Sequence, residues 1–270
     1  MKASIQLYDK LKQKVRLIYT QLKLNKLEKT KGRKLAISII ETISLALYKQ
    51  RQGIPTKKQV FDEFEPECSY KTLVVNINRF AKLAAFVLVA LLKFNQKQSC
   101  LVKYTDSTRI PVCLNKNAKH HKTMQGIAQW GKTKQGSKGW FYGLKLHITT
   151  DFKRRMLSIM FTPGNIDDRK PFMKLNKALY GWFFTDKGYI SEDLEEEFNQ
   201  EGKRILFTLP KKNMKKIMTG WQFFFSRGRA TIELNFRSLK MFHNLVTSMP
   251  RSVDGYFANY IYSLLSYLIS

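Results

Sequence analysis

Three carboxylates in this sequence lie at positions, such as strand ends, that often carry catalytic or metal-binding residues. Asp186 follows Phe183-Phe184-Thr185, which is typical of a buried strand, and Gly188 then turns the chain. Asp106 follows a second apolar strand, and Glu233 lies within a predicted helix. A buried carboxylate is costly unless it is paired or binds a metal ion. The pattern therefore predicts that Asp106, Asp186 and Glu233 together form one metal site.

Carboxylate oxygens indicate a hard divalent cation. Mg²⁺ prefers oxygen ligands, takes few of them from the protein and keeps water or phosphate oxygens in its other positions. Two such ions, about 3.5 to 4 Å apart, can activate the attacking oxygen and stabilise the leaving oxygen in a displacement at phosphorus. Under this hypothesis Asp106 bridges two ions, while Asp186 and Glu233 each complete one side.

Cationic residues accompany two of these carboxylates. Arg229, Glu233 and Lys240 fall close to one face of the predicted helix, and Lys187 follows Asp186 directly. Lys187 is therefore a candidate phosphate contact. The alternative is that Arg229 and Glu233 form an exposed ion pair of little energetic value and that Lys240 is solvated.

Other polar residues have simpler explanations. Turn and N-cap roles account for Asp151 and for Asp167-Asp168, although each could also be a ligand. His147 is predicted to be a hydrogen-bonded core residue of a strand.

The charge balance points to a polyanionic partner. The chain has 48 Lys and Arg residues against 20 Asp and Glu, which gives a net charge of +28 spread along its whole length. Nucleic acid is the first expectation and an acidic membrane surface the second. A generally basic or ribosome-associated protein would show the same balance.

Cysteine usage and apolar runs indicate a cytoplasmic protein without a membrane partner. Cys68, Cys100 and Cys113 lie far apart and lack a CxxC pairing, so neither a disulfide framework nor a zinc site is predicted. The uncharged apolar run from Leu83 to Leu92 is shorter than a bilayer requires.

Residues 1–98 are predicted to be helical. Amphipathic periodicity favours helices over 4–24 and 33–52, and Thr56 with Gln59 forms a capping box for a short helix. Ser69 then caps a long helix. The short helix, break and long helix resemble a helix-turn-helix, in which Lys71 and Arg79 would face DNA; an ordinary helical hairpin is equally consistent.

Residues 99–270 are predicted to form a second domain of mixed α/β class. Residues 115–139 read as a long basic loop. Alternating and apolar segments predict strands over 101–105, 140–150, 156–162, 183–185 and 204–209, and helices over 169–180, 192–200 and 229–242.

An ordered set of motifs in this second region resembles the bacterial insertion-sequence transposases of the DDE class, closest to the insertion-sequence 982 family. The motifs are Asp106-Ser107 with Pro111-Val112-Cys113, Gly139-Trp140-Phe141-Tyr142-Gly143, Lys145-Leu146-His147, Thr162-Pro163-Gly164-Asn165-Ile166-Asp167-Asp168-Arg169-Lys170-Pro171, Asp186-Lys187-Gly188-Tyr189-Ile190 and Lys211-Lys212-Asn213-Met214-Lys215.

The resemblance implies an RNase H-like mixed sheet flanked by helices, with Asp106, Asp186 and Glu233 as ligands of two Mg²⁺ ions for which Mn²⁺ can substitute. It also implies a homodimer bound to DNA. Related transposases carry a Tyr-x2-Arg-x3-Glu-x6-Lys pattern, which Arg229, Glu233 and Lys240 satisfy. Ser226 stands where the tyrosine is usual, and Pro250 also departs from the family pattern.

The sequence therefore predicts a DNA transposase that binds the inverted ends of its own element, cleaves there to free a 3′-OH and joins that hydroxyl to target DNA. Two alternatives stay open. One is a catalytically inactive DNA-binding protein derived from a transposase, and the other is a nuclease of the same fold that cuts without joining.

Overall fold

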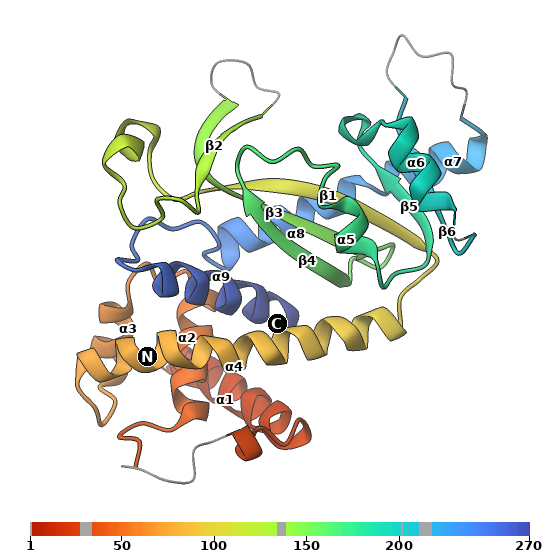
Figure 1. Cartoon of the computed structure of the whole chain (residues 1–270). Helices are drawn as coiled ribbons and strands as arrows, with labels where there is room; N and C mark the ends of the chain where they lie inside the picture. The colour runs from red at the N-terminus through yellow and green to blue at the C-terminus, as the bar shows by residue number, and fades with distance from the viewer. Residues whose placement is uncertain (1, 28–33, 134–138, 201, 211–217) are drawn as a thin grey trace. The chain divides into compact units, whose positions relative to one another are not determined.

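The computed structural model describes residues 2–27, 34–133, 139–200, 202–210 and 218–270 of the chain. The chain divides into two compact units, one helical and one with a mixed sheet (Figure 1). The helical unit contains Met1–Leu91 and Ser238–Ser270, and the α/β unit contains Leu92–Arg237. The motif Lys211-Lys212-Asn213-Met214-Lys215 lies outside the described residues.

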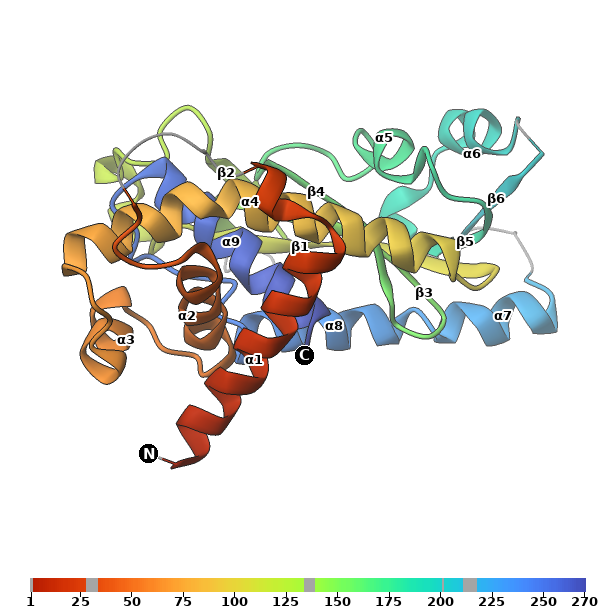
Figure 2. The same ribbon diagram turned by 90° about the horizontal axis from the view of Figure 1, so that it is seen from below.

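The helical unit is built around α2 (Ile39–Arg51), which packs against both α1 (Lys2–Gln21) and α9 (Val253–Leu268) (Figure 2). Nearly all of α2 is buried, including Gln50. The Gln50 side-chain amide donates to the Asn259 side-chain oxygen at 2.9 Å, which offsets the cost of burying both amides. The helix α9 also places Ala258, Tyr262 and Leu265 in the core of this unit.

Capping residues fix the helix boundaries in this unit. The predicted capping box of Thr56 and Gln59 starts α3 (Lys57–Phe64), and the Ser69 hydroxyl accepts from the Thr72 amide at 3.2 Å to start α4 (Tyr70–Lys97). The helix predicted over 33–52 begins later, because Ser38 is its N-cap.

The helix α4 meets the length and composition of a membrane span, although the uncharged run inside it is short. The core helix of a soluble protein meets the same test. One face of α4 is buried in the helical core through residues such as Leu73, Ile77 and Ala84, while Val75 and Phe86 are exposed. Its apolarity is thus partly explained by packing.

The α/β unit contains one six-stranded sheet with the order β2-β3-β1-β5-β6, and β4 also pairs with β3. The pairs β1–β3, β3–β4 and β2–β3 are antiparallel, whereas β1–β5 and β5–β6 are parallel, so the predicted mixed α/β class is confirmed. The strands are β1 (Val102–Pro111), β2 (Gln129–Lys132), β3 (Trp140–Asp151), β4 (Met156–Pro163), β5 (Gly181–Thr185) and β6 (Arg204–Thr208).

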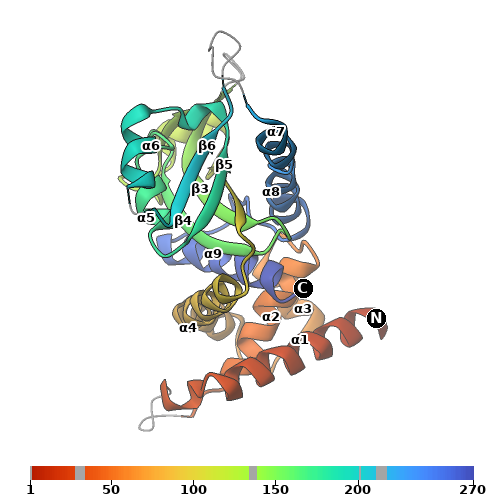
Figure 3. The same ribbon diagram turned by 90° about the vertical axis from the view of Figure 1, so that its right-hand side faces the viewer.

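Helices cover both faces of this sheet (Figure 3). On one face lie α5 (Phe172–Asn176) and α6 (Glu192–Asn199), and on the other lie α7 (Gly220–Arg227) and the first part of α8 (Ala230–Phe242). Successive side chains of β5 point to opposite faces of the sheet, so β5 packs against helices on both sides. Phe183 packs on Phe198 of α6, with ring centroids 4.9 Å apart, and Phe184 lies 6.1 Å from Phe225 of α7.

Two predictions about this unit were wrong. The segment 115–139 contains a short 3₁₀ helix, Asn115–His120, and the strand β2, which pairs with β3 beyond the end of β4. The helix predicted over 169–180 is only α5. The buried Asn176 side chain accepts from the Thr149 hydroxyl at 2.6 Å and so ties the end of α5 to the sheet.

Close backbone packing at Gly143 holds β1 against β3. A Cβ atom at residue 143 would overlap the Ile110 carbonyl oxygen and lie 2.9 Å from the Pro111 Cα atom. Because these are backbone atoms of a paired strand, they cannot move away without disturbing the ladder.

We therefore expect Gly143→Ala to lower the free energy of unfolding of the α/β unit by about 1–3 kcal/mol through overpacking. Urea unfolding followed by tryptophan fluorescence measures this loss. Gly220→Ala is the control, since no atom lies within 4 Å of a Cβ atom placed there. Equal stability of the two variants would contradict the prediction.

Candidate active site

Asp106 lies in the middle of β1 and not at its end, contrary to the sequence prediction. The strand continues to Pro111 because Ser107 to Pro111 pair with β3. On the other side of β1, pairing with β5 stops at Thr105, opposite Thr185. The β5 side of β1 therefore opens at Asp106.

Asp186 directly follows Thr185 at the carboxyl end of β5, as predicted. The register Thr105↔Thr185 places Asp106 and Asp186 at equivalent positions of neighbouring parallel strands, which lie about 4.8 Å apart. Asp186 is the N-cap of the 3₁₀ helix Lys187–Tyr189, and its Oδ1 accepts from the Lys187 amide at 2.6 Å. Two acidic residues thus lie side by side where the pairing of β1 with β5 ends.

Arg229 links Asp106 to Glu233. Its Nη1 donates to Asp106 Oδ2 at 2.9 Å, and its Nη2 donates to Glu233 Oε1 at 3.2 Å. The side chains of Asp106 and Arg229 are each 19% exposed, whereas that of Glu233 is 61% exposed. The ion pair between Arg229 and Glu233, which was the alternative prediction, is present. Arg229 also pairs with the mostly buried carboxylate of Asp106.

Two contacts set the position of α8 over the sheet. The buried Tyr104 hydroxyl donates to the Phe225 carbonyl oxygen at 3.0 Å, just before the α7–α8 junction. Asn235 then exchanges hydrogen bonds with Arg154 of the β3–β4 turn, donating to its carbonyl and accepting from its Nε, both at 3.1 Å. These contacts hold the first turns of α8 where Arg229 reaches Asp106.

Burial raises the pKa of Asp106 to about 6. The neighbouring Asp186 and Asp168 contribute to this increase, while the Ser107 amide and the Arg229 guanidinium act in the opposite direction. One guanidinium therefore only partly offsets the cost of the buried charge. A further cation at this place would stabilise the ionised carboxylate.

Asp168 contributes to the site, although a turn or N-cap role was the simpler prediction for it and a ligand role the alternative. Its Oδ2 accepts from the Ser107 hydroxyl and its Oδ1 from the Lys145 ammonium, both at 2.9 Å. It thereby anchors the segment after β4 beside Asp106. The signal in the sequence was its place in the Thr162 to Pro171 motif.

The remaining turn and core residues match their predictions. Asp167 accepts from the Arg169 amide at 2.9 Å, and Asp151 accepts from the Arg155 amide at the same distance, so both act in turns. His147 is buried and lies 2.8 Å from the Thr162 hydroxyl. Burial lowers the pKa of His147 to about 4, which keeps the ring neutral in the core.

The predicted DNA contacts divide between the two units. Lys187 is exposed beside Asp186 in the α/β unit. Lys71 and Arg79 are exposed on α4 of the helical unit, where the Arg79 guanidinium lies 5.6 Å from the centre of the Phe80 ring. Lys240 belongs to the part of α8 assigned to the helical unit.

The three predicted ligands do not form a preassembled metal cage. Among the residues that the structure describes, no three His, Cys, Asp or Glu side chains lie close enough together to hold a metal ion. Glu233 is bound by Arg229, while Asp106 and Asp186 come from adjacent strands. The donor set is nevertheless all carboxylate, which suits Mg²⁺ or Mn²⁺.

Gly228 lets the α7–α8 junction approach β1, because a Cβ atom there would overlap the Tyr104 hydroxyl. We expect Gly228→Ala to lower the free energy of unfolding by about 1–3 kcal/mol. The loss should be smaller when Tyr104→Phe is already present, since the overlapping oxygen is gone. A double-mutant cycle by urea unfolding measures the difference, and equal losses in both backgrounds would refute the proposed contact.

Comparison with known proteins places this chain in a family. No curated protein and no solved structure matches the chain. A family model described as a transposase DDE domain matches residues 96–253, more than half of the sequence and a range that includes Asp106, Asp186 and Glu233. The chain therefore belongs to the transposase DDE domain family.

Proposed function

We propose that this protein is a DNA transposase of the insertion-sequence 982 type. It binds the terminal inverted repeats of its element, hydrolyses a phosphodiester bond at each end to free a 3′-OH, and joins that hydroxyl to target DNA. The observation that carries the proposal is the convergence of Asp106 and Asp186 on adjacent parallel strands, with Glu233 joined to Asp106 through Arg229.

The order of elements supports an RNase H-like catalytic fold. The three long antiparallel strands β1, β3 and β4 are followed by a helix, a parallel strand, a second helix, a second parallel strand and the helices α7 and α8. In such a sheet, residues just beyond paired strand ends are accessible to a ligand. Asp106 and Asp186 occupy that position.

Asp106, Asp186 and Glu233 would hold two Mg²⁺ ions, for which Mn²⁺ can substitute. The ions supply activation of the attacking oxygen and charge stabilisation at the leaving oxygen. The incompletely neutralised Asp106 favours a cation here, and the exposed Glu233 side chain has room to turn. Arg229 occupies one oxygen of each of these two carboxylates. If the ions displaced its guanidinium, Arg229 would contact DNA phosphate.

Strong positive charge supports DNA as the partner. A net charge of +28 gives salt-sensitive attraction to phosphates throughout the chain. Lys187, Arg229 and Lys240 would contact DNA near the cleaved bond, and Lys71 and Arg79 would contact the element end through the α3–α4 pair. Because two ends must be joined, the active form would be a homodimer on DNA in the cytoplasm.

An inactive DNA-binding protein is the second candidate, and one observation favours it. Ser226 takes the place of the usual tyrosine, is buried in α7, and donates its hydroxyl to the Phe223 carbonyl oxygen at 2.7 Å. A tyrosine there would overpack α7, so the local structure has adapted to serine.

Carboxylate removal tests the site. Asp186→Asn and Glu233→Gln should each lower the rate of cleavage of DNA carrying the element ends by about 1000-fold or more, because a lost ligand removes several kcal/mol of transition-state stabilisation. Binding of the same DNA should stay within about twofold of wild type, since no phosphate contact is removed.

The control is Glu196→Gln, which makes the same charge change on the exposed face of α6. The assay is cleavage of labelled duplex in Mg²⁺, with the 3′ end of the product identified. Full cleavage by either site variant would refute the assignment. DNA binding by wild type without cleavage in Mg²⁺ or Mn²⁺ would support the inactive protein instead.

Metal dependence is a separate prediction. Chelation should abolish cleavage by wild type, and added Mg²⁺ or Mn²⁺ should restore it, because the carboxylates supply no alternative charge stabilisation. The circular dichroism spectrum should not change, since the strand ladder and the hydrophobic core are formed by other contacts than those of the carboxylate side chains. Cleavage that persists at saturating chelator would contradict metal catalysis.

A further inference from the structure

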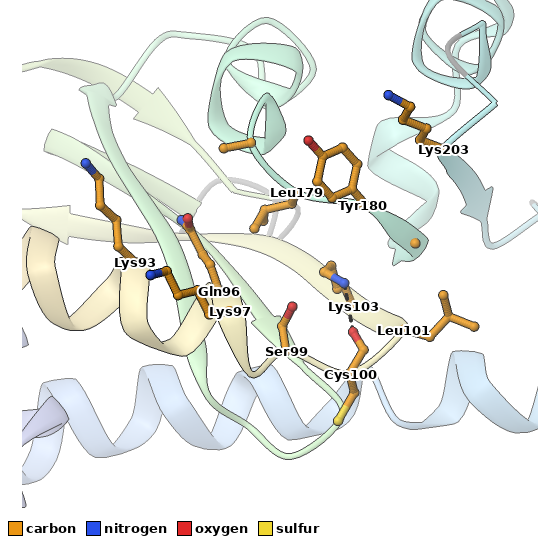
Figure 4. Close-up of a pocket in the computed structure, with 12 residues that line it drawn as sticks. Lys93, Gln96, Lys97, Ser99, Cys100, Leu101, Lys103, Leu179, Tyr180 and Lys203 are labelled. Carbon is orange, nitrogen blue, oxygen red and sulfur yellow. Dashed lines mark hydrogen bonds between the residues drawn. The ribbon is translucent and has the colours of Figure 1, made fainter.

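A second site lies in the α/β unit, at the N-terminal ends of β1 and β5, whereas the carboxylates lie in the middle of β1 and just after β5. It is an open pocket of about 680 Å³ between the end of α4, the start of β1 and the start of β5 (Figure 4). Leu101 and Gly181 line it, and both precede or begin these strands. Since β5 has 5 residues, its first and last Cα atoms are about 13 Å apart.

Lysine is the dominant charge of this pocket. Lys93 and Lys97 come from α4, Lys103 from β1, and Lys203 directly precedes β6 (Figure 4). None of the lining residues is acidic. Lys93, Lys97 and Lys203 are exposed, and within the described ranges their ammonium groups make no hydrogen bond or ion pair. Lys103 already has the Asp151 carboxylate nearby, but the three exposed ammonium groups repel each other unless an anion lies between them.

Lys103 is the unusual member, because it is only 3% exposed. Its ammonium donates to the Cys100 carbonyl oxygen at 2.7 Å, and it has three donors in total. Lys103 lies three positions before Asp106 in β1, so the two side chains face opposite sides of the sheet. An anion bound here is therefore not the phosphodiester that the carboxylates would hold.

The side-chain amide that lines the pocket is not available to read a base edge. The Gln96 side-chain amide is already engaged, since it donates to the Leu157 carbonyl oxygen at 2.8 Å. Leu101 and Tyr180 instead present apolar surface beside the lysines, against which a deoxyribose can pack. Such a site positions a phosphate backbone without selecting its sequence.

We propose that this lysine pocket binds the phosphate backbone of duplex DNA of arbitrary sequence, in the role of target DNA, apart from the element end held at the carboxylates. The proposal rests on the proposed function, because only a joining enzyme handles a second DNA segment. It adds a second DNA site on the catalytic unit, separate from the predicted contacts at Lys187, Arg229 and Lys240.

The test reverses two exposed pocket lysines, Lys97→Glu with Lys203→Glu, and leaves the buried Lys103 in place. Lys116→Glu with Lys119→Glu is the matched control, since it makes the same charge change at exposed residues of the same unit. Binding of a fluorescent duplex unrelated to the element ends is measured by anisotropy in chelator at several salt concentrations. Cleavage of an end duplex in Mg²⁺ is measured in parallel.

The pocket pair should weaken binding of unrelated duplex by about tenfold or more and reduce the salt slope by about 2, one for each lost phosphate contact. The control pair should change both much less. End cleavage should stay within about threefold of wild type, while joining to limiting target DNA should fall with the affinity.

Equal losses of affinity in the two pairs, with end cleavage intact in wild type, would overturn the pocket and leave the proposed function standing. Failure of wild type to cleave ends would overturn the proposed function. A pocket pair that loses end cleavage as strongly as joining would also overturn the separate role of this site.

Discussion

The ion pair between Arg229 and the mostly buried Asp106 is the interaction on which the site depends. Burying a carboxylate against the sheet raises its pKa, and one guanidinium at 2.9 Å reduces that cost without removing it. The same guanidinium binds Glu233, so the helix α8 is tied to β1 through charge as well as packing.

The geometry around this pair follows from the register of the sheet. Parallel pairing of β1 and β5 ends at Thr105↔Thr185, and the next residue on each strand is an aspartate. On the opposite face, Thr105 lies 2.8 Å from the Thr149 hydroxyl, which donates to Asn176. These buried polar contacts fix the register, because slipping by one residue would exchange the aspartate and threonine faces.

The α/β unit carries positive charge in two regions that differ in their acidic neighbours. Near the carboxylates the cations are paired or adjacent to acidic groups, as with Arg229 and Lys145. At the N-terminal ends of β1 and β5, four lysines line a pocket that has no acidic residue in its lining. The family assignment implies DNA as a partner of the chain. Two regions of different character on one unit suit an enzyme that brings two DNA segments together.

The sequence by itself determined the local features. These features depend on residues that are neighbours in the chain. They are the caps at Thr56 and Ser69, the strand before Asp186, the helix that carries Glu233 and the motifs that resemble DDE transposases. Only the tertiary structure decided that β1 continues past Asp106, that β2 pairs with β3, that Asn176 ends α5, and that four lysines from three segments share one pocket. These features depend on contacts between distant segments, which periodicity and propensity do not encode.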